Sequence, residues 1–302
     1  MQNMNNPYRF CPACRISNPQ SIGNKNNFQI LMCRECRSLY TSHLPAVEEA
    51  ENYDNYYNSQ NLDVPDFVHG RLGEIIESFS NYRDNNRLLD FGAGAGTILK
   101  VAREKNWQAF GVEVSEPAVE YARKLGFDVF HGEINEANYP DNYFDVVTAS
   151  EVLEHLENPL EVLKEIARIL RPGGLLWATT PHASGLSYRL IGLKWSVIAP
   201  PEHLQLYSRK AAFKMLRDAG FSDISLKTHS LNPMEIIHNL RLTQENKSET
   251  VKNENNFDRV QASYELNESF TRSRTRREVK NLMNNTLNLL QLGDSLKIMA
   301  RI

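Results

Sequence analysis

A glycine-rich turn flanked by carboxylates is the first chemical signal in the chain. An apolar run over residues 88–89 ends in Asp90, and Gly92, Gly94 and Gly96 follow at alternate positions. A strand, a glycine turn and a helix in this order form the first unit of a doubly wound α/β sheet. Glycine lets backbone approach a ligand closely, because no Cβ atom stands in the way. The pattern predicts a ligand site here, although any tight turn between a strand and a helix would also account for it.

The spacing within this turn favours a cationic ligand over a dinucleotide. Dinucleotide sites use G-x-G-x-x-G and place a pyrophosphate at the helix N-terminus. Here the spacing is G-x-G-x-G, and Thr97 occupies the position of the third dinucleotide glycine. The carboxylate of Asp90 would repel a pyrophosphate, but it suits a ligand that carries an ammonium and a sulfonium group. We therefore expect S-adenosylmethionine (SAM).

A second acid follows at a distance that suits a nucleoside. Glu113 ends an apolar segment over residues 109–112, seventeen residues after the last glycine of the turn. We expect a second strand there, whose terminal carboxylate accepts hydrogen bonds from both ribose hydroxyls. An exposed glutamate at a strand end is common in isolation, but its pairing with the glycine turn favours the ribose. A third strand, expected over residues 128–134, would bring Glu133 to the adenine amino group and Ile134 against the ring.

All four cysteines of the chain lie in its first 36 residues. Cys11 and Cys14 form one C-x2-C pair, and Cys33 and Cys36 form another after eighteen intervening residues. Two such knuckles predict a tetrahedral Zn²⁺ site, which is structural because four thiolates leave no open position. Two disulfides are the alternative, and a cytosolic compartment disfavours them.

Three histidines fall where an acceptor hydroxyl could be deprotonated. His155 and His182 follow the fourth and fifth expected strands, and His203 lies on the loop after them. A hydroxyl that takes a methyl group must lose its proton, and a neutral imidazole suits this task near pH 7. We expect His155 or His203 to be the base, with residues 184–207 closing over the acceptor as a lid. For each histidine, a capping or packing role is the alternative.

The elements that must position these residues follow from hydrophobic patterns. The length of 302 residues allows two domains. Further strands are expected over 143–149, 175–180, 224–227 and 295–300, and helices over 67–82, 160–170 and 208–220. The fold class is then α/β, a doubly wound, seven-stranded and mostly parallel sheet. The expected domains are a zinc ribbon over 1–45 with strands at 29–32 and 38–40, a connector and helix over 46–84, and a domain over 85–302 with a helical insertion at about 231–291.

Charge and hydropathy restrict the partners. The net charge of −3 gives no global basic field of the kind that nucleic-acid binders carry. Arg272, Arg274, Arg276, Arg277 and Lys280 form a basic cluster that could meet an anionic substrate or RNA, but a solvated helix face is favoured. No apolar run approaches the roughly 20 residues of a membrane span. The first six residues lack the basic and apolar regions of a signal peptide, so we expect a cytoplasmic location.

Five motifs in combination resemble class I SAM-dependent methyltransferases. They are L-D-F-G-A-G-A-G (89–96), G-V-E-V-S (111–115), F-D-V-V (144–147), E-V-L-E-H (151–155) and R-P-G-G (171–174). The resemblance covers residues 67–230 and implies a Rossmann-like fold. Within the class, E-V-L-E-H and R-L-G (71–73) look most like the ubiquinone-biosynthesis O-methyltransferases. The ribbon is similar instead to ribbon-bearing methyltransferases of surface-sugar or natural-product pathways.

The resemblance also implies a set of SAM contacts. Arg71 would pair with the methionine carboxylate, although a solvated helix arginine is an equal alternative. The whole expected set is Arg71, Asp90, Gly92, Ala93, Gly94, Gly96, Glu113, Val114, Glu133, Ile134 and Ser150. In the ubiquinone enzymes the E-x-x-E-H residues, here Glu151, Glu154 and His155, are associated with a divalent metal, so Mg²⁺ is a further expectation. Many members of the class carry the same residues as a helix start without a metal.

Together these features predict an enzyme that transfers a methyl group from SAM to a small molecule, at a hydroxyl of a sugar, phenolic or quinone-type intermediate. An RNA methyltransferase that binds RNA through its ribbon is one alternative. A non-catalytic SAM-binding module is another. The sequence specifies neither the acceptor nor the oligomeric state.

Overall fold

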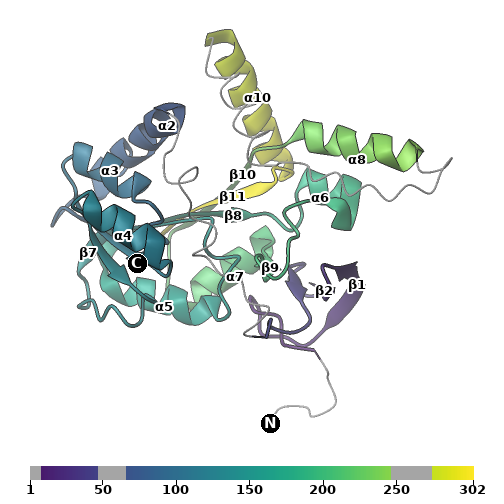
Figure 1. The fold of residues 1–302 in the computed structure, drawn as a ribbon, viewed down its shortest axis with the longest axis horizontal. Helices are drawn as coiled ribbons and strands as arrows, with labels where there is room; N and C mark the ends of the chain where they lie inside the picture. Colours follow the sequence, from purple (N-terminus) through teal and green to yellow (C-terminus); the bar gives the residue numbers. More distant parts are fainter. Residues whose placement is uncertain (1–7, 47–65, 246–273) are drawn as a thin grey trace. The chain divides into compact units, whose positions relative to one another are not determined.

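The computed structural model describes residues 8–46, 66–245 and 274–302 (Figure 1). A seven-stranded sheet has the order β10-β11-β8-β7-β4-β5-β6. Its strands are β4 (Arg87–Phe91), β5 (Gln108–Glu113), β6 (Asp128–His131), β7 (Phe144–Ser150), β8 (Leu170–Pro181), β10 (Ile224–His229) and β11 (Ser295–Arg301). The pairs β4–β5, β5–β6, β4–β7 and β7–β8 are parallel. The predicted doubly wound sheet is therefore confirmed, and its strand order reverses at β4, where such folds bind ligands.

Amphipathic helices accompany these strands. They are α2 (Asp66–Glu77), the short 3-10 helix η1 (Ser80–Tyr82), α3 (Thr97–Glu104), α4 (Glu116–Lys124), α5 (Pro159–Ile169) and α7 (Arg209–Asp218). In α3, the apolar residues recur at helical spacing and are buried, with Leu99 and Ala102 fully inaccessible. Phe79 lies 6.2 Å from Trp177 between ring centroids, in the cluster that joins α2 to β4 and β8. Burial of these side chains fixes β4, and hence the glycine turn that follows it.

The predicted ribbon is a larger sheet than the sequence indicates. It has the strand order β1-β2-β3-β9, from β1 (Pro19–Lys25), β2 (Phe28–Cys33), β3 (Leu39–Thr41) and β9 (Gln205–Leu206), and every pair is antiparallel. The segment of β1 is mostly polar, so no hydrophobic alternation marks it in the sequence. Leu206 of β9 lies opposite Leu39. A strand of the ribbon sheet therefore comes from residues 184–207, which were expected to form a lid.

A hydrophobic core joins the ribbon to that later segment. Phe28 and Met32 of β2 lie in one buried cluster with Trp195, Ile198 and Leu206. Four further elements follow β8 and β10: α6 (Leu186–Ile191), the 3-10 helix η2 (Gly192–Lys194), α8 (Pro233–Glu245) and α10 (Arg274–Leu290). The side chains of the basic cluster between residues 272 and 277 lie outside the described residues. No helix in the described ranges is both long and apolar enough to cross a bilayer.

By its contacts the chain divides into two compact units. The ribbon unit contains Met1–Leu44, Pro181–Ala211 and Lys227–Leu296, and the sheet unit contains Pro45–Thr180, Ala212–Leu226 and Lys297–Ile302. The sequence predicts domains that follow one another along the chain. The contacts instead group the first segment with two later ones, because their apolar side chains share a core.

Candidate active site

The glycine turn between β4 and α3 has the backbone geometry that its sequence predicts. Gly92, Gly94 and Gly96 have φ values of +76°, +50° and +83°. Other residues adopt this left-handed region only with strain, so glycine is required. A Cβ atom at Gly92 would also stand 2.4 Å from Cγ2 of Val152. The turn therefore depends on glycine for both its conformation and its close packing.

Glu113 connects the end of β5 to this turn. Its side chain is buried, and its Oε2 accepts a hydrogen bond from the N–H of Gly94 at 2.8 Å. Its Oε1 accepts from the N–H groups of Val114 at 2.8 Å and Ser115 at 2.9 Å. Hydrogen bonds to an ionised carboxylate are about twice as strong as neutral ones. These bonds to the turn are a structural role of Glu113 that residue spacing does not reveal, and its contact with a ribose stays a prediction.

Asp90 is buried beneath the turn. Its Oδ1 accepts a hydrogen bond of 2.7 Å from Oγ1 of Thr148 on β7. Burial raises the pKa of Asp90 to about 8, the Thr148 hydrogen bond opposes this, and the nearby Glu113 carboxylate adds to it. The carboxyl group therefore carries a proton over much of the neutral range. A cation bound beside it would favour the ionised form.

The other expected cofactor residues occupy different settings. Ile134 is buried, and Glu133 beside it is exposed. Oγ of Ser150, at the end of β7, lies 3.1 Å from Oγ1 of Thr179 on β8. Arg71 is exposed on α2. Hydrogen bonds join Glu113 to the turn, whereas the contacts of Arg71, Glu133 and Ser150 with a cofactor stay predictions.

The E-x-x-E-H segment follows β7, and its second acid is buried. Glu154 is fully buried and accepts a hydrogen bond of 2.9 Å from Oγ1 of Thr180. Burial, and then the neighbouring Glu151 carboxylate, raise the pKa of Glu154 well above its ordinary value. Mg²⁺ binds ionised oxygen ligands in near-octahedral geometry. The Mg²⁺ expectation at Glu151, Glu154 and His155 gains no support from these contacts.

The expected catalytic histidines differ in their surroundings. His182 is buried, its Nδ1 lies 2.9 Å from the carbonyl oxygen of Gly293, and burial lowers its pKa to about 4. His203 is also buried, with Nδ1 at 2.6 Å from the carbonyl oxygen of Val197. A carbonyl can only accept, so Nδ1 of His203 carries the hydrogen and Nε2 is the basic nitrogen. His155 is half-buried in the sheet unit, whereas His203 is in the ribbon unit. That they face each other across an acceptor stays a prediction.

The four cysteines converge. Their Sγ atoms all lie within 4.8 Å of one another, and all four side chains are buried. Cys11 and Cys36 are 3.5 Å apart between sulfurs, as are Cys14 and Cys33. A disulfide would need about 2.05 Å. Zn–S bonds of 2.3 Å in a tetrahedron separate the sulfurs by roughly 3.8 Å, so the arrangement suits a tetrahedral metal site.

One buried charge pair was not singled out from the sequence. Asp145 of β7 is fully buried and accepts N–H hydrogen bonds from Asp84 at 2.9 Å and Asn86 at 2.7 Å. Nε of Arg171 donates to it at 2.6 Å. Burial acts to raise the pKa of Asp145, but these donors hold it below its ordinary value. The F-D-V-V and R-P-G-G motifs therefore meet in a network that fixes the loop before β4. The signal in the sequence is an acid and an arginine at the starts of adjacent strands.

The glycine turn, the acid at the end of β5 and the parallel sheet define a Rossmann-like domain of the SAM-binding class. A family described as a methyltransferase domain matches residues 66–226. The chain therefore belongs to this methyltransferase family, and it is a SAM-dependent methyltransferase.

Individual relatives agree with this assignment. A ubiquinone biosynthesis O-methyltransferase of Thiobacillus denitrificans is 28% identical over 168 residues, which are 51% of this chain and 72% of that protein. The 27-O-demethylrifamycin SV methyltransferase of Amycolatopsis mediterranei is 35% identical over 129 residues, 38% of this chain and 47% of its own. A SAM-dependent methyltransferase from Archaeoglobus fulgidus has a similar fold, with a TM-score of 0.53 at 20% identity over 83% of this chain and 100% of that one.

Proposed function

We propose that the enzyme transfers the methyl group of SAM to a hydroxyl of a small molecule. The relatives named ubiquinone biosynthesis O-methyltransferase support this class of reaction, and the rifamycin relative supports it independently. A phenolic or quinone-type acceptor fits the ubiquinone-biosynthesis relatives, and a sugar hydroxyl is the further acceptor that the sequence analysis predicts. The net charge of −3 weighs against RNA as the acceptor.

The observation that carries the proposal is the hydrogen bond between Glu113 and the N–H of Gly94. It holds a carboxylate beside a left-handed glycine turn at the carboxyl end of the sheet, where such folds bind nucleotides. In the proposed complex, Glu113 accepts hydrogen bonds from the ribose hydroxyls, Ile134 packs against adenine and Glu133 accepts from its amino group. Asp90 faces the cationic end of SAM, and Arg71 pairs with its carboxylate. Ala93, Val114 and Ser150 complete the cofactor site.

The chain's own residues would then move the proton. Bound SAM supplies an electrophilic methyl group on a sulfonium centre. The enzyme must align the acceptor oxygen with this group and remove the hydroxyl proton as the bond forms. His203 suits the role of base, because its Nδ1–H donates to the carbonyl of Val197, so that Nε2, which lies 3.7 Å from Oε1 of Glu202, is the nitrogen that would accept a proton. His155, after β7, is the second candidate for the same role.

The cysteine cluster is proposed to hold one structural zinc ion. Four buried sulfurs at tetrahedral spacing are the support for this assignment. Four thiolates close the coordination sphere, so the ion would contribute to folding and not to methyl transfer.

The proposal is tested by release of S-adenosylhomocysteine with catechol, a hydroquinone, a nucleotide-linked hexose and purified RNA as acceptors. We expect turnover with one of the three small molecules. His203→Ala or His155→Ala should then lower turnover by roughly 10²–10⁴-fold at unchanged SAM affinity. Turnover with RNA alone would refute the small-molecule proposal. Near-full activity of both histidine variants would refute the base. Loss of activity with EDTA that Mg²⁺ alone restores would support the metal alternative.

A further inference from the structure

We propose that the zinc ribbon is a scaffold for residues 195–206, the segment that carries His203. In this assignment Lys25, Asn26 and Arg9 are positioning residues, because they hold backbone groups of that segment. The inference rests on the proposed function only for the catalytic role of His203. The contacts themselves lie within the ribbon unit.

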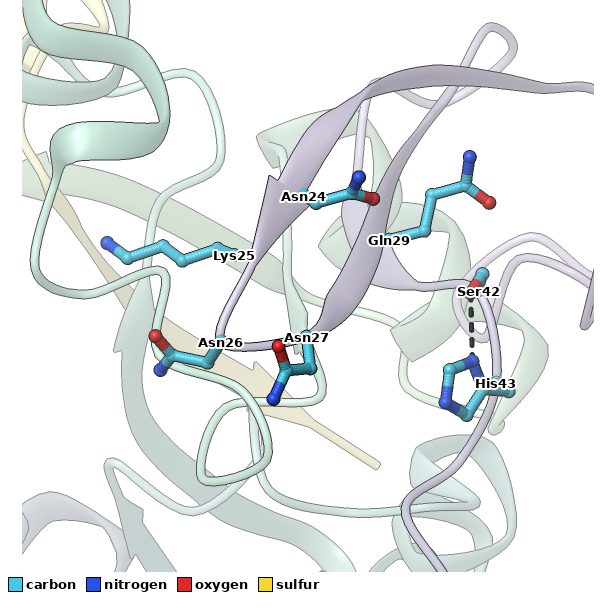
Figure 2. A pocket seen from close by; sticks show the side chains of 7 residues that line it. All are labelled: Asn24, Lys25, Asn26, Asn27, Gln29, Ser42 and His43. Atoms are coloured by element: carbon cyan, nitrogen blue, oxygen red, sulfur yellow. Dashed lines mark hydrogen bonds between the residues drawn. The ribbon is translucent and has the colours of Figure 1, made fainter.

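The tip of the β1–β2 hairpin holds the first half of the segment. Nζ of Lys25 donates to the carbonyl oxygen of Trp195 at 2.7 Å, and Nδ2 of Asn26 donates to that of Pro200 at 2.9 Å. Figure 2 shows Lys25 and Asn26 extending to one side of the hairpin, away from Gln29 and His43. Burial lowers the pKa of Lys25, which marks a partly desolvated ammonium group. A hydrogen bond from such a group is stronger than one in water.

The other end of the segment is held by β3 and the residues before the first cysteine. The N–H of Thr41 donates to the carbonyl oxygen of Leu204 at 3.0 Å. Nη2 of Arg9 donates to the same carbonyl at 2.8 Å and to Oε1 of Gln205 at 3.0 Å, while its Nε donates to the carbonyl of Thr41 at 2.8 Å. Arg9 therefore ties β3 and β9 together through side-chain bonds as well as the strand pairing.

The insertion helix α8 holds the same segment from a different element. Glu235 is buried, and its Oε1 accepts a hydrogen bond of 2.6 Å from the N–H of Ser196. The adjacent residue, Trp195, is the one whose carbonyl accepts from Lys25. Glu235 also attracts the Lys25 ammonium, which partly offsets the effect of burial on its pKa. Two neighbouring residues of the segment are therefore held by the ribbon and by α8.

The hydrogen bonds described above, which we call anchors, lie on both sides of the bond between His203 and Val197 that orients the His203 imidazole. Val197, whose carbonyl accepts from Nδ1 of His203, follows Ser196 directly. His203 itself precedes Leu204, which Arg9 and Thr41 hold. Both partners of the imidazole hydrogen bond are therefore one residue from an anchor. The ribbon thus determines which ring nitrogen of His203 is basic and where it lies.

The metal site connects to this scaffold at the second cysteine knuckle. Oγ of Ser208, two residues after β9, donates to the carbonyl oxygen of Cys36. Nζ of Lys210 donates to the carbonyl of Glu35 at 2.7 Å. Arg9 lies two residues before Cys11. Loss of the metal would free the knuckles, and with them the groups that hold residues 195–206.

The first test reads the tautomer of His203 without any acceptor. The full-length protein is labelled with ¹⁵N-histidine, and long-range ¹H–¹⁵N spectra are recorded, with His203→Gln identifying the signal. We expect wild type to show the Nδ1–H form alone, and Asn26→Asp and Lys25→Met to show mixed tautomers. Asn27→Asp is the matched control, because Asn26 and Asn27 both have positive φ, at 48° and 65°, and only Asn26 holds the segment.

The second test measures hydrogen exchange of the same full-length variants. Amides of residues 195–206 should exchange up to about tenfold faster in Lys25→Met and Asn26→Asp, as expected for loss of one hydrogen bond. Treatment of wild type with a zinc chelator should also speed their exchange. Residues 87–115 and SAM affinity should not change. If both variants behave like Asn27→Asp, or if the segment stays protected after metal loss, the scaffold is refuted. Full turnover by His203→Ala would refute the proposed base and leave the exchange result standing.

Discussion

At the residue scale, Glu113 holds the glycine turn and is also the proposed ligand of the ribose. Glu113 accepts three backbone N–H groups, from Gly94, Val114 and Ser115, before any ligand binds. A carboxylate has about four acceptor positions, so capacity remains for a ribose hydroxyl. The conformation of the turn and the proposed contact with the ribose therefore depend on the same side chain.

Removal of this side chain should weaken SAM binding strongly. Glu113→Ala loses hydrogen bonds to a charged group, so affinity measured by isothermal titration should fall by about 1.5–3 kcal/mol, roughly 10- to 150-fold. Glu104→Ala is the control, because Glu104 is an exposed glutamate at the end of α3. Equal affinities of the two variants would contradict the assignment.

Asp90 should make SAM binding depend on pH. Its pKa is raised from 3.8 to about 8, so the protein loses stability as pH rises through this range, because the unfolded chain releases this proton and the folded protein keeps it until about pH 8. A cationic ligand favours the ionised form, so binding at low pH must release a proton. Wild-type affinity relative to Asp90→Asn should therefore rise with pH, by up to about tenfold per unit below pH 8.

The comparison with Asp90→Asn is needed because SAM carries an α-amino group of its own. Such a group titrates at about 7.7–8.0, close to the pKa of Asp90. Both proteins bind the same ligand, so their affinity ratio isolates the protein carboxyl. A ratio that is constant with pH would show that Asp90 does not face the cationic groups of SAM.

Among the elements, β4 depends on a network at its N-terminal end. Asp145 at the start of β7 holds the loop before β4 through N–H groups of Asp84 and Asn86, and Arg171 links it to β8. Arg171 also donates to the carbonyl of Tyr82 at 2.6 Å. This network fixes the end of β4 opposite to the glycine turn, so it stabilises the strand that presents the turn.

Removal of the negative charge of Asp145 should destabilise the fold. Asp145→Asn leaves Arg171 without its buried partner, which should cost about 3–5 kcal/mol in urea unfolding. Asp141→Asn is the control, since Asp141 is 69% exposed and its pair with Arg168 should contribute about 0–1 kcal/mol. The pKa of Asp145 is depressed, so its contribution is complete above the ordinary value of 3.8 and is lost as pH falls below it. Equal stabilities of the two variants would contradict this role.

At the scale of the whole molecule, the chain leaves the ribbon unit and returns to it twice. The ribbon sheet is completed by β9, which pairs with β3. The cysteine cluster therefore belongs to a unit whose core includes residues from 183 to 236. A metal at this site would stabilise that whole unit and not only the first 44 residues.

Metal analysis of the purified protein should give one Zn per chain. Cys33→Ser should lose the metal, because three thiolates remain for a site built for four. It should also lower the thermal stability of the ribbon unit, and added Zn²⁺ should not restore it. Alkylation followed by mass spectrometry checks the state of the thiols. If the four cysteines were oxidised in pairs and no metal were bound, the zinc assignment would be wrong.

The sequence alone determined the features that depend on local spacing. Gly92, Gly94 and Gly96 adopt left-handed backbone within one turn, and the acids Asp90 and Glu113 follow short apolar runs that are typical of buried strands. The two C-x2-C pairs likewise predict a metal site, and the four sulfurs converge as that prediction requires. The doubly wound sheet followed from the alternation of such strands with helical patterns, and the structure confirms it.

Only the tertiary structure decided how distant segments meet. The pairing of β9 with β3 joins Leu206 to Leu39, and no local pattern specifies which distant edge a two-residue strand completes. The hydrogen bonds of Glu113 to the turn and of Lys25 to Trp195 are likewise invisible in residue spacing. Such contacts are selected by burial of a shared core, here Phe28 with Trp195, and that free energy depends on the folded arrangement and not on neighbours in sequence.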